Sequence, residues 1–243
     1  MSDSNTNGES KPQLSQSRSS RRSFLYASAT GVAAAVAVVS GFTMLDSHSV
    51  QAQDVSTPDA ALKQLMDGNR RFVESKPTAH QQDLEILRRH LAGTQEPFAA
   101  ILACADSRVP VEIVFDQTIG QLFVARVAGN MVTPEIIGTL EYGIEVLGTK
   151  VVMVLGHSDC GAVKAAIAGK AVPGQISTLY PHLQPAVDNA GPDPKAVTRA
   201  NAKIQARLLS EASTVAAAKI KAGQLKVVAG YYDIGSGAVT VLD

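Results

Sequence analysis

The sequence predicts an α/β fold: a mostly parallel four-stranded sheet with a fifth strand at the C-terminus and helices on both faces. Apolar runs of strand length alternate with segments of helical periodicity, a pattern typical of parallel sheets covered by crossover helices. Of the 243 residues 45% are hydrophobic, which is enough for one substantial core. The chain has 2 cysteines, too few for a scaffold held together by disulfides.

The charge balance of the chain argues against a nucleic-acid partner. The chain has 22 Lys and Arg against 22 Asp and Glu, so its formal net charge is zero. Without a basic excess there is no electrostatic reason to expect binding to nucleic acid. We therefore expect no nucleic-acid partner, and contact with a membrane only through the N-terminal segment.

The first 52 residues have the features of an export signal, which leaves residues 53–243 as the mature domain. Two arginines at 21–22 precede an uncharged stretch at 23–45, and the small residues that signal peptidases recognise end at Ala52. This pattern resembles a twin-arginine signal, which exports folded proteins. It predicts cleavage after Ala52 and residence in the periplasm or an equivalent extracytoplasmic compartment. The alternative is an uncleaved anchor helix, because the uncharged stretch is long enough to span a bilayer.

The N-terminal half of the mature domain is predicted to alternate helices and strands. Thr57, followed by a proline, is a typical helix start, and apolar residues at helical spacing continue that helix to about Ser75. A second helix is expected over 83–91. The continuous apolar run at 97–103 indicates a strand buried on both faces. Residues 121–127 are predicted to form the next strand.

The C-terminal half is predicted to continue the alternation. The expected order is helix, strand, helix, a Pro- and Gly-rich segment with one short helix, a long Ala-rich helix and two paired strands. The corresponding ranges are 133–147, 150–155, 159–168, 169–194, 197–223, 225–232 and 238–242. In sheets of this kind ligands bind beyond the carboxyl ends of the strands. We therefore expect the functional residues there.

Two of these strand ends carry reactive side chains. The motif CADSR, from Cys104 to Arg108, follows the first strand, and GHSDCG at 156–161 follows the third. Both cysteines of the chain thus lie at one edge of the sheet, with His157 three residues before Cys160. Two thiolates and one imidazole suit zinc, and three protein ligands leave a fourth position open for water or substrate.

The spacing alone leaves two alternatives to a metal site. The cysteines of an exported protein could form a disulfide, since the compartment is oxidising. They could also be inert buried thiols. Export of the folded protein favours a metal, because the ion would be loaded in the reducing cytoplasm before transport.

Together the two motifs resemble those of the β-class carbonic anhydrases, and the resemblance extends over nearly the whole mature chain. It implies one zinc ion per chain, with Cys104, His157 and Cys160 as ligands. It also implies that Asp106 and Arg108 form a catalytic dyad beside the metal. The implied activity is the reversible hydration of carbon dioxide to bicarbonate and a proton by zinc-bound hydroxide.

Four further residues match the substrate pocket of the plant-like members of that family. The resemblance implies that Gln95 contacts substrate through its amide and that Phe123 and Tyr142 form apolar walls. Gly161 matches the glycine that follows the last ligand. Because those members build the pocket from two chains, the resemblance also implies a homodimer or a higher homo-oligomer.

The charges of the predicted site suggest a role for the dyad. Two thiolates make a zinc site formally neutral, so neighbouring groups matter more than beside a three-histidine site. Asp106 would accept the proton of the nucleophile, and Arg108 would keep Asp106 ionised and turned away from the metal. If Arg108 released it, Asp106 would swing onto the zinc and close the site.

Three other functions would use the same residues. One is hydrolysis of carbonyl sulfide or carbon disulfide on the same fold. Another is a non-catalytic protein that binds zinc or bicarbonate, which would be expected to lose a ligand, Asp106 or Arg108; none is lost. The third is a redox protein with a disulfide between Cys104 and Cys160.

Overall fold

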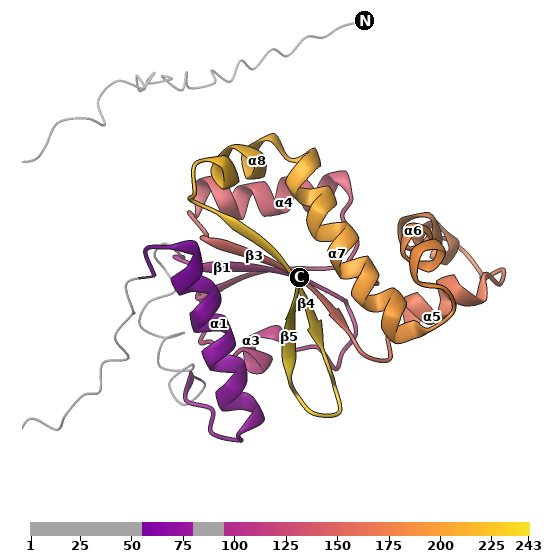
Figure 1. Cartoon of the computed structure of the whole chain (residues 1–243), viewed down its shortest axis with the longest axis horizontal. Coiled ribbons are helices and arrows are strands. Elements are labelled where there is room, and N and C mark those ends of the chain that lie inside the picture. The colour runs from indigo at the N-terminus through magenta and orange to yellow at the C-terminus, as the bar shows by residue number, and fades with distance from the viewer. Residues whose placement is uncertain (1–54, 80–94) are drawn as a thin grey trace, which may run out of the picture. The chain divides into compact units, whose positions relative to one another are not determined.

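The computed structural model describes residues 55–79 and 95–243 (Figure 1). The predicted export segment, residues 1–52, and the predicted helix at 83–91 lie outside the described residues, so both stay predictions. Among the described residues, no helix is both long and apolar enough to cross a membrane.

The described chain is built around a five-stranded sheet in the order β2-β1-β3-β4-β5. Four strands are parallel: β1 (Ala99–Ala103), β2 (Leu122–Arg126), β3 (Val151–His157) and β4 (Lys226–Tyr232). The C-terminal strand β5 (Val239–Leu242) is antiparallel to β4. The predicted fold class is therefore confirmed.

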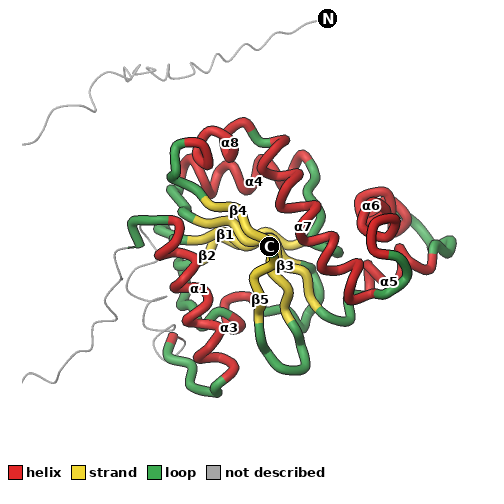
Figure 2. Tube along the Cα trace, viewed as in Figure 1, coloured by secondary structure: helices red, strands yellow, loops and turns green. Residues whose placement is uncertain are grey.

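Helices cover both faces of this sheet, and the strands lie between them (Figures 1 and 2). Helices α1 and α3 pack on one face, and α4, α7 and α8 pack on the other. Their bounds are Pro58–Val73 for α1, Val111–Val114 for α3, Pro134–Glu141 for α4, Pro194–Ala212 for α7 and Thr214–Lys221 for α8.

Strand β1 shows why its run of residues had to be apolar throughout. Ala100 and Leu102 belong to the core under α4, α7 and α8, whereas Ala99, Ile101 and Ala103 belong to the core under α1 and α3. Successive side chains of a strand point to opposite faces, so a strand covered on both sides has no solvent-facing position. All five side chains are accordingly buried.

Strand β3 is longer than predicted and has His157 as its last residue. Its pairing with β4 continues to the partners His157 and Tyr232. Gly156 permits this extension under α7, because a Cβ atom there would lie 2.8 Å from Cγ2 of Thr198. The histidine is therefore held by the sheet rather than by a loop.

The predicted helix at 197–223 is two helices that meet at Ser213. The Ser213 hydroxyl accepts a hydrogen bond from the backbone N–H of Ala216 and donates one to Oε1 of Glu141, at 3.0 and 2.6 Å. A serine hydroxyl that accepts a hydrogen bond from a backbone N–H three residues later acts as an N-cap, so it favours the start of a new helix over continuation of the old one. The Ala-rich composition of the segment conceals this break.

The segment at 169–194 is more helical than predicted. A 3₁₀ turn, Ile176–Leu179, leads into the α-helix α6, Tyr180–Ala190. The helix tolerates Pro185 in its interior, where proline removes a hydrogen bond. Burial of its inner face, including Leu183, compensates for that loss.

Candidate metal centre and active site

The candidate site lies where β1 and β3 end side by side. Ala103 of β1 pairs with Leu155 of β3, so Cys104 follows β1 directly and His157 ends β3 nearby. The chain leaves β1 towards α3 on one face, and leaves β3 through α5 (Gly161–Ala168) towards α7 on the other. Connections that diverge in this way leave a crevice between the strand ends, where ligands of α/β proteins bind.

Cys104, His157 and Cys160 form a compact, buried cluster in this crevice. Their ligand atoms all lie within 4.8 Å of one another. The two sulfur atoms are 4.0 Å apart and both thiols are free. A disulfide requires a sulfur–sulfur distance of about 2.0 Å, whereas two thiolates on one tetrahedral zinc lie about 3.8 Å apart. The separation fits two ligands of one ion.

The His157 ring is oriented for metal binding. Its Nδ1 atom is 2.9 Å from the carbonyl oxygen of Ser158. A carbonyl only accepts, so Nδ1 donates and the lone pair of the ring is on Nε2. Among the described residues Nε2 is buried without a hydrogen-bond partner. An unpaired buried acceptor is costly, and a cation in the cluster would remove that cost.

The sulfur atoms of the two cysteines are close enough to influence each other's ionisation. A hydrogen bond from Cys160, together with one from the backbone N–H of Gly129, lowers the pKa of Cys104 to about 4. The same hydrogen bond, together with burial, raises the pKa of Cys160. Two thiolates 4.0 Å apart repel each other, so ionising both requires a positive charge between them. A divalent metal would supply that charge.

Asp106 and Arg108 form a forked ion pair beside the cluster. The guanidinium donates from Nε to Oδ1 at 3.0 Å and from its NH2 nitrogen to Oδ2 at 2.8 Å, and the Arg108 backbone N–H donates to Oδ1 at 2.9 Å. These hydrogen bonds hold the pKa of Asp106 well below its usual range. Oδ2 lies 4.0 Å from Nε2 of His157. An ionised carboxylate therefore stands at the edge of the ligand cluster.

Arg126 holds the turn that carries both Cys104 and Asp106. It donates from Nε to the carbonyl oxygen of Cys104 at 2.9 Å and from its NH2 nitrogen to that of Asp106 at 2.5 Å. No role for Arg126 was predicted from the sequence. The available signal was its position one residue before the end of the strand predicted at 121–127, because the carboxyl ends of parallel strands meet at the same sheet edge.

Gly129 is a second residue of the site that the sequence analysis missed. Its N–H donates to the sulfur of Cys104 at 3.3 Å, and its carbonyl accepts from the buried side chain of Asn201 at 2.9 Å. Its φ of 78° lies in the left-handed region, and a Cβ atom would lie 3.2 Å from Leu183. Glycine is thus the residue that this turn accommodates without strain.

Two of the predicted substrate residues, Phe123 and Tyr142, lie together. Their ring centroids are 6.1 Å apart with an angle of 38° between the planes. Gly143 permits this packing, because a Cβ atom there would lie 2.8 Å from the Phe123 ring. Tyr142 begins a π-helical turn, Tyr142–Val146, and remains 48% exposed. The pair therefore forms an apolar surface that this chain covers only in part.

The other two predicted substrate residues are placed without a contact that tests their role. Gln95 is exposed, four residues before β1. Gly161 begins α5, and no described atom lies within 4 Å of where its Cβ atom would stand. Their contacts with substrate stay predictions.

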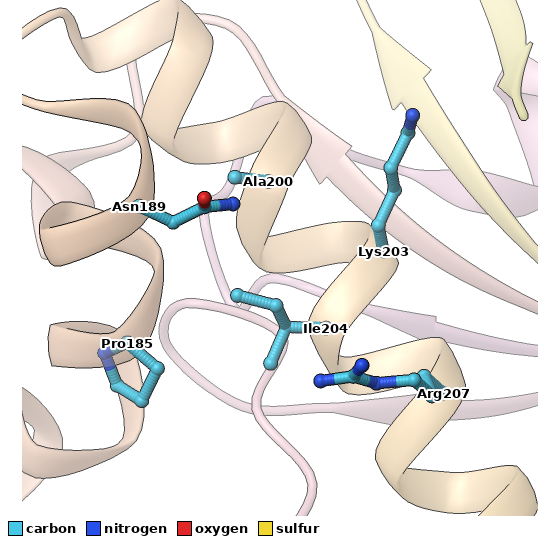
Figure 3. Close-up of a pocket in the computed structure, with 6 residues that line it drawn as sticks. All are labelled: Pro185, Asn189, Ala200, Lys203, Ile204 and Arg207. Atoms are coloured by element: carbon cyan, nitrogen blue, oxygen red, sulfur yellow. The ribbon is translucent and has the colours of Figure 1, made fainter.

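A separate groove lies between α6 and α7 (Figure 3) and has a volume of about 470 Å³. Two residues of α6 and four of α7 line it: Pro185, Asn189, Ala200, Lys203, Ile204 and Arg207. None of the predicted ligand, dyad or substrate residues is among them. The groove is therefore distinct from the candidate metal centre.

Comparison with known families agrees with this geometry. Residues 99–239, more than half of the chain, match the family model described as carbonic anhydrase. The chain belongs to the carbonic anhydrase family. Both motifs fall within the matched residues, so the family match covers the cluster and the dyad together. The chain is an enzyme that catalyses the reversible hydration of carbon dioxide.

Two similar bacterial proteins are named carbonic anhydrases. The chain is 34% identical over 197 residues to carbonic anhydrase 2 of Mycobacterium tuberculosis, covering 77% of this chain and 94% of that protein. It is 40% identical over 136 residues to a carbonic anhydrase of Mycolicibacterium smegmatis, covering 54% of this chain and 66% of that protein.

Solved structures with a similar fold assign the chain to the β-class. One chain from the crystal structures of two tetrameric β-carbonic anhydrases of the ascomycete Sordaria macrospora matches with a TM-score of 0.60 and 25% identity, covering 74% of this chain and 96% of that chain. The β-carbonic anhydrase CafA of Aspergillus fumigatus matches with a TM-score of 0.59 and 27% identity, covering 76% and 90%.

Proposed function

We propose that this carbonic anhydrase hydrates carbon dioxide with one zinc ion held by Cys104, His157 and Cys160. The observation that carries the proposal is the buried cluster of three ligand atoms within 4.8 Å, in which Nε2 of His157 has no other partner among the described residues. Zinc, when bound, supplies a Lewis acid that makes a coordinated water acidic near neutral pH, the behaviour for which carbonic anhydrases are the standard example.

The proposal gives Asp106 the role of orienting the nucleophilic oxygen. Its ionised Oδ2 atom stands 4.0 Å from Nε2 of His157, at the edge of the cluster, and can accept a proton in a hydrogen bond from that oxygen. Arg108 keeps the carboxylate ionised and fixes its orientation by binding both of its oxygens. The apolar rings of Phe123 and Tyr142 would limit the approach of bulk water.

The proposal includes assembly into a homodimer or a higher oligomer. Tyr142, a predicted pocket residue, is 48% exposed in the single chain, and Val146 in the same π-helical turn is 62% exposed. Large exposed apolar side chains beside a site favour burial against a partner. The Sordaria macrospora neighbours are described as tetrameric, which supports assembly of this chain as well.

The proposal also includes export through the twin-arginine signal in residues 1–52. The basis is sequence alone: the arginine pair at 21–22, the uncharged stretch and the small residues ending at Ala52. Fractionation of cells expressing the full chain tests it. A variant with lysines at 21–22 is expected to stay in the cytoplasm, and an unchanged periplasmic fraction would contradict the export route.

Removal and return of metal test the zinc dependence. The purified full chain is treated with a chelator, dialysed and assayed by stopped-flow hydration of carbon dioxide. We expect about one zinc per chain before treatment, loss of activity with the metal, and recovery on adding zinc alone. Full activity in the metal-free protein would contradict the proposal.

A further inference from the structure

Arg108 is held by two aspartates rather than one. Asp106 binds its Nε and NH2 nitrogens at 3.0 and 2.8 Å. From the other side, the NH1 nitrogen donates to Oδ2 of Asp159 at 3.4 Å, and NH2 donates to the Asp159 carbonyl oxygen at 3.3 Å. A guanidinium has five N–H groups, so the two aspartates do not compete for the same hydrogens. All three nitrogens are engaged.

The backbone conformation of Asp159 turns both its side-chain carboxylate and its carbonyl group towards Arg108. Its φ of 61° lies in the left-handed region, where Asp and Asn are tolerated better than other side chains. The residue stands between the last residue of β3, His157, and the N-cap of α5, Cys160. The turn that brings two metal-ligand candidates together therefore also presents Asp159 to the dyad.

Lys164 fixes the Asp159 carboxylate from α5. Its ammonium group contacts Oδ1, while Oδ2 faces Arg108. The contacts form a row of alternating charges: Lys164, Asp159, Arg108 and Asp106. Each carboxylate in the row lies beside a cation, so neighbouring groups in the row attract each other.

Arg108 needs such support because its side chain is 47% exposed. A single exposed ion pair holds a long side chain weakly, since ordering it costs conformational entropy and water screens the attraction. Contacts at two edges of the planar guanidinium restrict both its position and its rotation. The orientation of Asp106 depends on that restriction, because its two oxygens follow the fork.

We propose that Asp159, anchored by Lys164, is a positioning residue that holds Arg108 on Asp106 and so keeps Asp106 from turning onto the metal cluster. This inference rests on the proposed role of Asp106 beside the metal. Asp159 acts through Arg108 alone and has no contact with substrate in this account.

The test uses variants of the full-length zinc-loaded enzyme. Asp159→Asn keeps a residue suited to the left-handed backbone and keeps the carbonyl contact, but removes the charge. We expect kcat to fall about 2- to 5-fold, the size that loss of one exposed charged contact allows. Lys164→Met should lower kcat about 2-fold, and Lys164→Arg should restore it, because the anchor needs only a cation.

A matched control is Lys63→Met, which breaks an exposed ion pair with Asp67 on α1. We expect its kcat, zinc content and thermal midpoint to equal those of the wild type. The Asp159 and Lys164 variants should also keep wild-type zinc content and thermal midpoint. A fall in kcat that follows a fall in zinc content or in thermal midpoint would overturn the positioning role.

The deciding readout is hydrogen exchange at the Arg108 Nε–H, followed by ¹⁵N NMR and assigned with Arg108→Lys. We expect exchange several-fold faster in Asp159→Asn. We also expect Asp159→Asn to cause no further loss of kcat in an Arg108→Ala background. Unchanged exchange, or an additive loss, would overturn the inference. Failure of the proposed function looks different: Asp106→Asn would then keep full activity, while exchange at Arg108 would still respond to Asp159.

Discussion

Two of the Arg–Asp pairs among the described residues, Arg71–Asp116 and Arg108–Asp106, have the same chemistry and differ in their surroundings. Asp116, paired with Arg71, has a side chain with no exposed surface. Asp106, paired with Arg108, keeps 17% of its side chain exposed. In both pairs hydrogen bonds to the carboxylate lower the pKa of the aspartate, although burial opposes this at Asp116 more than at Asp106.

The hydrogen bonds around Asp116 are complete. Besides Arg71, its two oxygens accept from the backbone N–H groups of Thr78 and Ala79 and from the Thr78 hydroxyl, at distances between 2.9 and 3.1 Å. Every donor aimed at the carboxylate comes from this chain. The pair therefore fastens the segment after α1 to the end of α3.

The hydrogen bonds around Asp106 are complete on one side only. Arg108 and its backbone donate to both oxygens, and Oδ2 also lies 4.0 Å from Nε2 of His157, which has no hydrogen-bond partner among the described residues. The comparison teaches that the ion pair itself does not mark a functional site. What marks it is the buried polar group next to the pair that no residue of the described chain satisfies.

The largest expected effect comes from removing a ligand. Cys160→Ser leaves two protein ligands, and serine is a poor zinc ligand at neutral pH. We expect zinc to be absent after dialysis and activity to fall by about 1,000-fold or more. Metal analysis and stopped-flow hydration check both. If the Cys160→Ser variant hydrates carbon dioxide normally without metal, the cluster beside Asp106 is not a catalytic metal site, and the surroundings of Asp106 and Asp116 no longer differ in function.

A smaller loss of activity is expected from Asp106→Asn. The amide cannot act as a purely accepting, charged group, so turnover should fall about 100-fold while zinc content stays near one per chain. Parallel kinetics and metal analysis measure the two quantities. If turnover is unchanged, Asp106 has no more functional importance than Asp116.

For Asp116→Asn we expect a loss of stability without a loss of activity. Replacing one partner of a buried, fully bonded pair should lower the free energy of unfolding by about 2 kcal/mol. Activity per folded enzyme should stay at the wild-type level. Urea unfolding gives the first quantity. The exposed pair of Lys63 and Asp67 supplies the control, since Asp67→Asn is expected to cost less than about 0.5 kcal/mol.

The smallest effect is a pH dependence of that stability difference. The pKa of Asp116 is lower in the folded state, so its contribution is complete above the unfolded-state value of about 3.9 and is lost as pH falls through the folded value. We expect wild type and Asp116→Asn to differ by a constant amount near neutral pH and to converge below about pH 4. A difference that grows in acid would show the opposite sign of the pKa shift.

The parts of this account that the sequence predicted depend on local patterns. The apolar run at 97–103 indicated β1, and two short motifs contained the three clustered ligand candidates and the dyad. The break at Ser213 was missed because its hydroxyl bonds Glu141, 72 residues away. Asp116 was missed for the same reason, since its partners Thr78 and Ala79 are 38 and 37 residues away.

The support of the dyad was also beyond local patterns. Arg126, at the end of β2, donates to the carbonyl oxygen of Cys104, which follows the neighbouring strand β1. Asp159 contacts Arg108 although 51 residues separate them in the sequence. Such contacts depend on strand order, which the sequence did not predict. Only the rule that carboxyl ends of parallel strands meet at one edge pointed to that region.

The most direct test is a crystal structure of the purified full-length enzyme with anomalous data at the zinc edge. The account predicts one zinc peak per chain, bonded to Sγ of Cys104, Sγ of Cys160 and Nε2 of His157, at about 2.3 Å from each sulfur and about 2.0 Å from the nitrogen. Continuous density between the two sulfurs with no anomalous peak would contradict it.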